Sequence, residues 1–258
     1  MLPDELLLFA VLSWQAVTHL SSYGSRWSQT YRQLGSTEQS YWCYSVTSTV
    51  HAVVISALCV SALLEEPDVS PFTLGGPFYT TTAASNQLLQ IFFGYILSDT
   101  VGCLWYNRRW PGWQANLIHH ATAGLIALLF LVAELGHSLG IAAILLEVTT
   151  PLVNARWFLD TCGLRGSTLY LANGIAMTLL WLIVRVLGGA GIGVMLAYQW
   201  HEVPRSLQPR QQPYFLTRAA ASRRSRKSLP PSRRASPLPT WWATACRSSG
   251  SRRSRRGQ

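Results

Sequence analysis

The sequence has few charged residues, no paired cysteine motif and few histidines, and each shortage excludes a class of protein. Charged residues make up 12% of the 258 residues, about half the share found in soluble globular domains. The five cysteines are odd in number and form no CxxC motif, which argues against a disulfide framework or a zinc knuckle. Six histidines with one adjacent pair are too few for the repeated histidine clusters of a di-iron hydroxylase or desaturase, and we expect no metal site.

Apolar and aromatic residues are abundant instead. Apolar side chains account for 49% of the sequence, which includes 11 tryptophans and 10 tyrosines. These two aromatic residues are enriched where a membrane span meets water. The composition therefore indicates an integral membrane protein.

Charge is divided unevenly along the chain. Residues 1–203 hold 7 basic and 11 acidic side chains, a formal charge of −4, whereas residues 204–258 hold 14 basic side chains and no acidic one. Because the Arg/Ser/Pro-rich composition of 204–258 cannot form a packed core, we expect a disordered tail. Arginine-rich tracts can bind RNA, but behind a membrane domain we expect contact with anionic lipid headgroups and no nucleic-acid partner.

The apolar residues fall into runs that are long enough to cross a bilayer, which takes about 20 residues. Six such runs lie near 5–21, 44–64, 88–106, 115–135, 138–158 and 168–187. A shorter glycine-rich run at 189–200 is either a seventh span or the broken end of the sixth. The first run lacks a basic flank and starts with Asp4 and Glu5, which favours a retained span over a signal peptide. We predict an all-α, polytopic transmembrane bundle of six to seven spans over residues 1–203.

Charges between the spans predict an orientation. The segments after the first, third and fifth spans carry arginine, namely Arg26 and Arg32, Arg108 and Arg109, and Arg156 and Arg165. The segments after the second and fourth spans carry Glu65, Glu66, Asp68 and Glu134, with no arginine or lysine. By the positive-inside rule the arginine-bearing segments are cytosolic and the N-terminus is outside or lumenal.

Polar residues inside the spans share helix faces. In the fifth span Glu147, Thr150, Pro151 and Asn154 follow the i, i+3, i+4, i+7 spacing of one stripe. Pro151 cannot donate to the carbonyl of Glu147, so we expect the helix to kink there. The other spans add His51, Tyr95, Asp99, the adjacent His119 and His120, Asn173 and Arg185.

Two interpretations of these residues remain open. An ionised aspartate at a helix centre costs about 2.5–3.5 kcal/mol on insertion scales, so Asp99, Glu147, His119 and His120 favour a polar functional cavity. Interhelical hydrogen bonds that orient the bundle average about 0.6 kcal/mol each. That second interpretation is favoured for Thr47, Ser48, Asn173 and Arg185.

Five stretches resemble the TLC-domain family of multispanning helical proteins. They are STVH (48–51), GYILSD (94–99), NLIHH (116–120), LLEVTTPLVNARWF (145–158), and Asn173-Gly174 followed by Arg185. The likeness covers roughly residues 40 to 187 and keeps the order and spacing of the motifs. It implies a role in lipid synthesis, transport or sensing, with membrane lipids as partners. It also implies an endoplasmic reticulum or other endomembrane location, with the plasma membrane as the alternative.

Ceramide synthases are the best-understood enzymes of this family, and their His-His pair lies in the acyl-transfer site. The resemblance implies that His119 or His120 acts as base or nucleophile on an acyl thioester, with Asp99 orienting one ring. It implies substrate contacts from His51, Tyr95, Glu147, Asn154 and Arg185. No bound cofactor is implied, and acyl-CoA would be a co-substrate.

Three functions remain open. Ceramide synthases carry acidic residues upstream of their Leu-Leu-Glu, whereas SLGIAAILLE (138–147) has no acid before Glu147. We therefore place lipid binding, sensing or trafficking in lipid homeostasis first and a ceramide-synthase-type acyltransferase, with a sphingolipid product, second. Kinked helices with charges near the membrane midplane also suit a transporter, but no inverted repeat is visible.

Overall fold

The computed structural model describes residues 4–65, 81–106, 110 and 112–199, and every element in these ranges is helical. The α-helices are α1 (Asp4–Ser25), α2 (Gln29–Gln33), α3 (Ser36–Glu65), α4 (Ala83–Tyr106), α5 (Trp113–Ala133), α6 (His137–Leu145), α7 (Thr150–Thr161), α8 (Thr168–Trp181) and α9 (Gly189–Gln199). A 3₁₀ segment, η4 (Leu146–Thr149), joins α6 to α7, and a π-helical segment, η5 (Leu182–Gly188), joins α8 to α9. The predicted disordered tail, 204–258, lies outside the described residues.

The prediction of a multispanning helical bundle is confirmed. Six helical stretches in the described ranges are long and apolar enough to cross a membrane: Glu5–Ser25, Ser36–Glu65, Ala83–Trp105, Trp113–Ala133, His137–Thr161 and Thr168–Ala197. The glycine-rich run near 189–200 continues the sixth stretch through η5 and α9. It is therefore the end of the sixth span and not a seventh.

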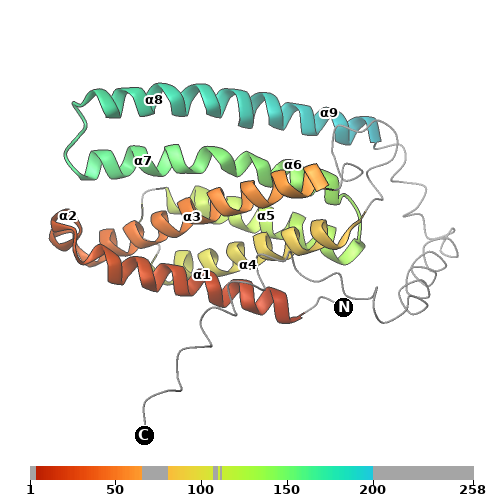
Figure 1. Cartoon of the computed structure of the whole chain (residues 1–258), viewed down its shortest axis with the longest axis horizontal. Helices are drawn as coiled ribbons and strands as arrows, with labels where there is room; N and C mark the ends of the chain where they lie inside the picture. Colours follow the sequence, from red (N-terminus) through yellow and green to blue (C-terminus); the bar gives the residue numbers. More distant parts are fainter. Residues whose placement is uncertain (1–3, 66–80, 107–109, 111, 200–258) are drawn as a thin grey trace, which may run out of the picture. The chain divides into compact units, whose positions relative to one another are not determined.

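Helix α4 is the centre of the bundle and packs against α1, α3, α5 and α6 (Figure 1). Its buried Leu89, Phe92 and Ile96 form the main core with Ile55 of α3 and Ile141 of α6. Because neighbouring helices cover most of the surface of α4, this helix has no polar face directed at solvent. Any polar residue that α4 does carry must therefore find a partner inside the bundle.

A glycine allows α1 and α4 to approach closely. A Cβ atom placed on Gly94 would lie 2.7 Å from Ala10 Cβ and 3.2 Å from Val11 N. Small residues at such crossings let helix backbones pack together in membranes. A polar link adds to the contact, because Gln15 Nε2 donates to the carbonyl and the hydroxyl oxygen of Ser98, both at 2.9 Å.

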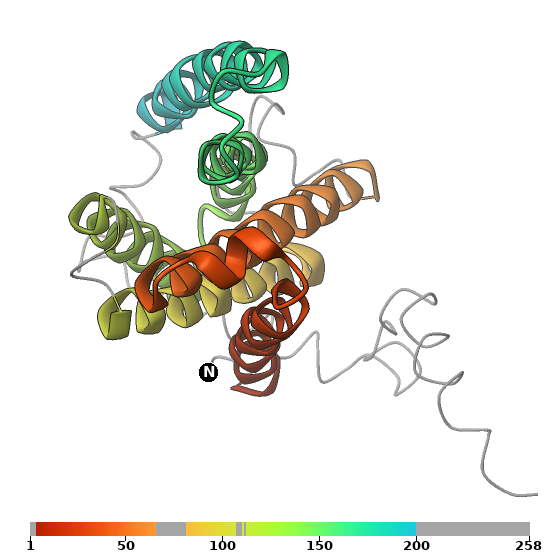
Figure 2. The same cartoon turned by 90° about the vertical axis from the view of Figure 1, so that its left-hand side faces the viewer.

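Helix α7 lies between α3 and α8, as both views show (Figure 1, Figure 2). The sixth span packs on α7, α6 and η4, and its apolar side chains are largely exposed, among them Leu169, Ile175 and Ile183. Exposed apolar side chains on a span are satisfied by lipid tails. The sixth span is therefore the most lipid-exposed of the six.

The expected break at Pro151 is present. Helix α6 ends at Leu145, the chain tightens into η4, and α7 starts at Thr150 with Pro151 in its first turn. Proline is tolerated there because its missing N–H falls among the first N–H groups of a helix, which have no intrahelical partner. The Thr150 N–H instead bonds the Glu147 carbonyl in an i+3 contact. This break places Glu147 in a segment that is not α-helical.

The arginines that follow the first and fifth spans gather at one end of the bundle. The α1–α3 connection, with Arg26 and Arg32, and the α7–α8 turn, with Arg165, lie at the same end, and the α5–α6 turn, with Glu134, lies at the other (Figure 1). Arg156 differs from the expectation, because it lies within α7 and not in the following turn. The remaining residues of the charge pattern, Glu66, Asp68, Arg108 and Arg109, lie outside the described residues. The membrane side of each end stays a prediction.

Candidate functional site

A cavity of about 370 Å³ lies among α3, α4, α5, η4, α7 and the sixth span, and we call it the central cavity. Seven of the eight residues singled out from the sequence line it: Tyr95, Asp99, His119, His120, Glu147, Asn154 and Arg185. These residues come from five separate elements, and all of them except His119 were expected from their position on a polar stripe. The stripes therefore converge on one interior space.

The adjacent histidines point in different directions, because consecutive helical residues are about 100° apart around the axis. The His120 side chain is 5% exposed and its Nε2 lies 3.4 Å from Asp99 Oδ2, whereas His119 is 48% exposed. The His120 ring also has Nδ1 3.5 Å from Thr100 Oγ1. The pair thus divides into one buried ring and one ring at the cavity surface.

The hydrogen bond of Thr100 indicates which nitrogen of the His120 ring faces Asp99. The Thr100 hydroxyl donates to the Ile96 carbonyl at 2.6 Å, so its oxygen is left to accept from His120 Nδ1–H. Nε2 then faces the Asp99 carboxyl at 3.4 Å. An imidazole held in this way by a carboxylate has a fixed orientation and can accept or release a proton.

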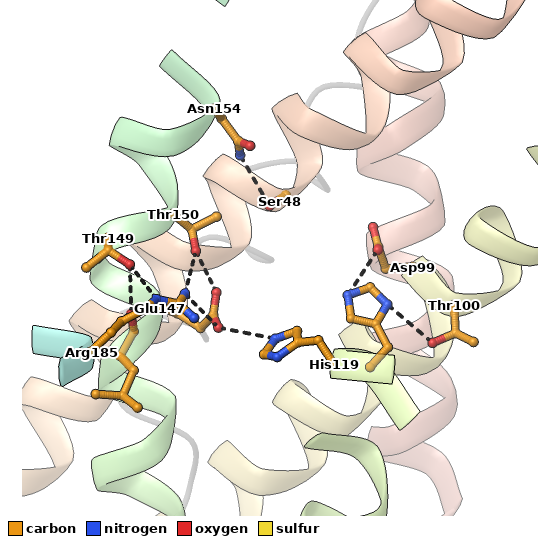
Figure 3. Close-up of polar contacts among 11 residues, drawn as sticks. Ser48, Asp99, Thr100, His119, Glu147, Thr149, Thr150, Asn154 and Arg185 are labelled. Atoms are coloured by element: carbon orange, nitrogen blue, oxygen red, sulfur yellow. Dashed lines mark hydrogen bonds and ion pairs between the residues drawn. The ribbon is translucent and has the colours of Figure 1, made fainter. Parts of the chain in front are cut away.

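His119 faces a second carboxylate. Its Nε2 lies 3.9 Å from Glu147 Oε1, and Figure 3 shows the ring directed at Glu147 across the cavity. The two rings have centroids 5.7 Å apart. The cavity therefore holds two imidazole–carboxylate pairs side by side, one buried and one accessible.

Glu147 is fixed by the opposite side of the cavity. Arg185 Nη2 lies 3.4 Å from Glu147 Oε1, and the Thr150 hydroxyl donates to Glu147 Oε2 at 2.7 Å (Figure 3). Arg185 Nε donates to Thr149 Oγ1 at 2.8 Å. The guanidinium and Thr150 hold the carboxylate in one position, and Thr149 in turn positions the guanidinium.

Asn154 fixes α7 against α3 at the cavity wall. Its Nδ2 donates toward Thr49 Oγ1 at 2.9 Å, the Ser45 carbonyl at 3.0 Å and Ser48 Oγ at 3.2 Å. Three acceptors share two N–H hydrogens, so the NH₂ group of the amide is satisfied without a ligand. This geometry fits the interhelical-bond interpretation at least as well as a substrate contact.

Of the eight residues expected to act in catalysis or substrate contact, His51 alone does not line the cavity. Its ring is 1% exposed and stacks on Tyr95 with centroids 3.6 Å apart, and Trp14 packs on its other side. Neither ring nitrogen has a hydrogen-bond partner. His51 therefore supports Tyr95 from behind, and Tyr95, which interacts with Ser48 and Asp99, forms the cavity wall.

Several of the residues that line the central cavity were not predicted from the sequence. The rim includes Tyr41, Tyr44, Trp110, Trp113 and Trp181. Tyr41, Tyr44, Trp110 and Trp113 lie at the ends of spans, where aromatic residues are expected at the membrane interface and carry no site signal. Trp181 shares a helical stripe with Arg185, and that spacing was the available clue. Thr100 and Thr149 contact site residues through their hydroxyls. Single threonines in apolar runs are common, so neither residue carried a signal in the sequence.

Among the described residues no group of three histidine, cysteine or acidic side chains is placed to hold a metal ion. The arrangement instead offers hydrogen-bond donors and acceptors, and two imidazoles able to transfer protons. It suits the polar end of a ligand that reaches into a bundle surrounded by lipid.

Comparisons with known proteins agree with this architecture. Residues 41–245 match the TLC domain (TRAM_LAG1_CLN8). TLC domain-containing protein 4 from Xenopus tropicalis is 30% identical over 184 residues, which cover 70% of this chain and 65% of the relative. The Homo sapiens protein of that name is 26% identical over the same coverage, and TLC domain-containing protein 4 A from Dictyostelium discoideum is 22% identical over 60% of this chain and 58% of the relative. The chain thus spans somewhat less than two thirds of the frog and human relatives.

No solved structure matches the chain. The matched region starts at Tyr41, the first residue that lines the central cavity, and continues past Arg185, the last. It also extends beyond residue 203, where the sequence predicted the domain to end, into residues that the structure does not describe. Because the match covers most of the chain and every residue that lines the cavity, the protein belongs to the TLC domain family.

Proposed function

We propose that this protein binds the polar part of a membrane lipid in the central cavity and acts in lipid homeostasis by binding, sensing or moving that lipid. One observation carries the proposal: a polar cavity with two imidazole–carboxylate pairs lies among apolar spans. Ionisable groups are costly inside a membrane and persist where they serve a ligand, an ion or a proton path.

The volume and packing favour a lipid over a soluble metabolite. A volume of about 370 Å³ is at the small end of ligand pockets, enough for a headgroup with its linkage but not for acyl chains. Helix α5, which carries His119, packs mainly on α4 and α6, whereas Trp181 and Arg185 belong to the sixth span, which packs on α7. Acyl chains of such a ligand would leave the cavity between these two groups of helices and enter the bilayer.

The lining groups favour a headgroup that donates hydrogen bonds. Asp99 and Glu147 offer acceptor oxygens, and His119 is accessible, with one ring nitrogen that has no partner among the described residues. Hydroxyl, amide and amine groups match this set, and sphingoid lipids carry all three kinds. A sphingolipid in the endoplasmic reticulum or another endomembrane is therefore our proposed ligand and location.

Lipid retention tests this proposal. We would purify the full chain in a mild detergent and identify co-purifying lipids by mass spectrometry. His119→Ala should lower the amount of one bound lipid class several-fold, because the accessible ring loses its contact. Trp27→Ala, which changes an exposed residue outside the cavity, serves as the control. Equal lipid content in wild type and His119→Ala would contradict a ligand in the central cavity.

The buried pair of Asp99 and His120 favours a second function, acyl transfer from acyl-CoA to a lipid amine or hydroxyl. In that reaction a cavity imidazole takes the proton from the attacking nitrogen or oxygen as this atom bonds to the thioester carbon. The tetrahedral intermediate then expels the CoA thiolate, which receives the proton from the imidazolium. The same imidazole–carboxylate geometry supports both steps.

Transfer of the labelled acyl group from radiolabelled acyl-CoA, measured with purified protein in lipid nanodiscs, separates the two functions. An acyltransferase should lose turnover in His119→Ala or His120→Ala while it still binds lipid, because a base acts in the transition state. A lipid-binding protein should show no transfer in the wild type. Transfer that survives the double variant would remove both histidines from the chemistry.

A further inference from the structure

A second hollow lies between α7 and α8, apart from the central cavity. Its volume is about 760 Å³, and we call it the α7–α8 groove; Arg156, Arg165, Tyr170, Gly174, Ile175 and Leu171 are among its lining residues. It shares no lining residue with the central cavity. The groove lies next to the α7–α8 turn, at the end of the bundle that also carries Arg26 and Arg32.

Arg156 provides the charge of this groove. Its guanidinium carbon lies 4.2 Å from the centroid of the Tyr170 ring, an arrangement that stabilises a cation without neutralising it. Among the described residues it forms no ion pair with a carboxylate. Asp160, the acidic residue nearest to it along α7, is 3.9 Å from Arg165 Nε. The groove therefore keeps one uncompensated positive charge.

A glycine makes room for this guanidinium. A Cβ atom on Gly174 would lie 2.6 Å from Arg156 Nη1. Arg156 thus packs between the Tyr170 ring and the bare backbone of α8, and its position is set by both. Asn173, beside this glycine, donates to the Leu152 carbonyl at 3.0 Å and ties α8 to α7 at the same level.

The depth of the charge matches a lipid phosphate. Arg156 is five residues before the end of α7 at Thr161, which is about 8 Å of helix at 1.5 Å per residue. Arginine and tyrosine at that depth lie where headgroups meet acyl chains. Leu171 and Ile175 continue the groove wall with exposed apolar side chains. The groove thus has a cation at one end and an apolar wall along its length.

We propose that the α7–α8 groove binds an anionic glycerophospholipid, with the phosphate on Arg156 and an acyl chain along α8. Charge complementarity selects this occupant, because a single positive charge without a nearby acid suits a headgroup whose phosphate carries no cation of its own. A zwitterionic headgroup would bring its ammonium group close to the same guanidinium. The site is independent of the ligand proposed for the central cavity.

Competition between two lipids tests the proposal. The full chain in detergent micelles is mixed with equal amounts of phosphatidylglycerol and phosphatidylcholine that have the same acyl chains, and bound lipids are counted by native mass spectrometry. The wild type should prefer phosphatidylglycerol, and Arg156→Gln should lower that preference about five-fold, the effect of one basic residue near an anionic headgroup. Arg26→Gln is the matched control, because Arg26 also lies over a tyrosine, Tyr23, at 5.6 Å but is not among the residues that line the α7–α8 groove.

A second variant tests position without a change of charge. Gly174→Ala should push the guanidinium away from its place and lower the preference while the net charge stays the same. If Arg156→Gln does not fold, Gly174→Ala tests by itself whether the position of the guanidinium determines the preference for phosphatidylglycerol. Excess glycerol 3-phosphate should not displace the lipid, since it lacks the acyl chains. An unchanged preference in Arg156→Gln and Gly174→Ala, an equal loss in Arg26→Gln, or displacement by glycerol 3-phosphate would each overturn the proposal.

Discussion

Arg185 and Glu147 join a π-helical and a 3₁₀-helical segment, the two helical segments of the described residues that depart from α-helical geometry. Arg185 lies in the π-helical η5 and Glu147 in the 3₁₀ segment η4, and Arg185 Nη2 is 3.4 Å from Glu147 Oε1. π-Helical turns occur frequently at functional sites. Each irregular segment turns its charged side chain toward the central cavity, so the ion pair and the local backbone geometry support each other.

We expect strong coupling between these two residues. Glu147→Gln and Arg185→Gln should each lower the unfolding temperature, because each leaves a partly buried charge without its partner. The double variant should lose less than the sum of the two, with a coupling free energy of about 0.5–3 kcal/mol. Thermal unfolding of the four proteins in one detergent measures this. Additive losses would mean that the ion pair contributes nothing.

The two histidines should differ in their effect on stability. His120→Ala leaves the buried Asp99 carboxyl without its imidazole partner, which costs about 1–3 kcal/mol. His119→Ala should leave the free energy of unfolding nearly unchanged, since its ring is 48% exposed. Asp99→Asn combined with His120→Ala should recover part of the loss. Chemical unfolding in detergent is the measurement, and a larger loss in His119→Ala than in His120→Ala would contradict this assignment.

Adding even a methyl group at the α1–α4 crossing should lower the free energy of unfolding. Gly94→Ala places a Cβ 2.7 Å from Ala10 Cβ, and such overpacking typically costs about 1–3 kcal/mol. Gly24→Ala is the matched control in α1, because nothing lies within 4 Å of its added Cβ. That control should be neutral or slightly stabilising, as alanine is the better helix former. Equal unfolding temperatures for the two variants would disprove the close approach.

A native cysteine can report the orientation. Cys162 is exposed at the end of α7, whereas Cys43, Cys59 and Cys103 are buried. With Cys246 replaced by serine, an impermeant maleimide should label Cys162 only from the cytosolic side, as the positive-inside rule requires. A Glu134→Cys reporter in a Cys162→Ser, Cys246→Ser background should label only from the opposite side. Labelling of both reporters from one side would overturn the predicted topology.

Polar stripes in the sequence indicated most of the candidate residues that the fold brings to the central cavity, because helical spacing is a local property. Asp99 and Glu147 could be placed on interior faces from their spacing alone, and both line the central cavity. His51 followed the same logic, yet it lies behind Tyr95 and has no access to the cavity. Spacing along a helix predicts which way a side chain points, but it does not predict whether another side chain lies between that residue and the cavity.

The sequence by itself determined the six spans, the polar stripes and the family, because hydropathy and motif spacing depend only on neighbours along the chain. It also placed the helix break at Pro151, since a missing N–H acts locally. The tertiary structure alone decided how two adjacent histidines divide into a buried partner of Asp99 and an accessible partner of Glu147. That division depends on where α4 and η4 lie around α5, and contacts between segments far apart in sequence leave no local signal. For the same reason only the packing of α7 on α8 revealed that Arg156, expected in a loop, lies against Tyr170 with no carboxylate partner among the described residues.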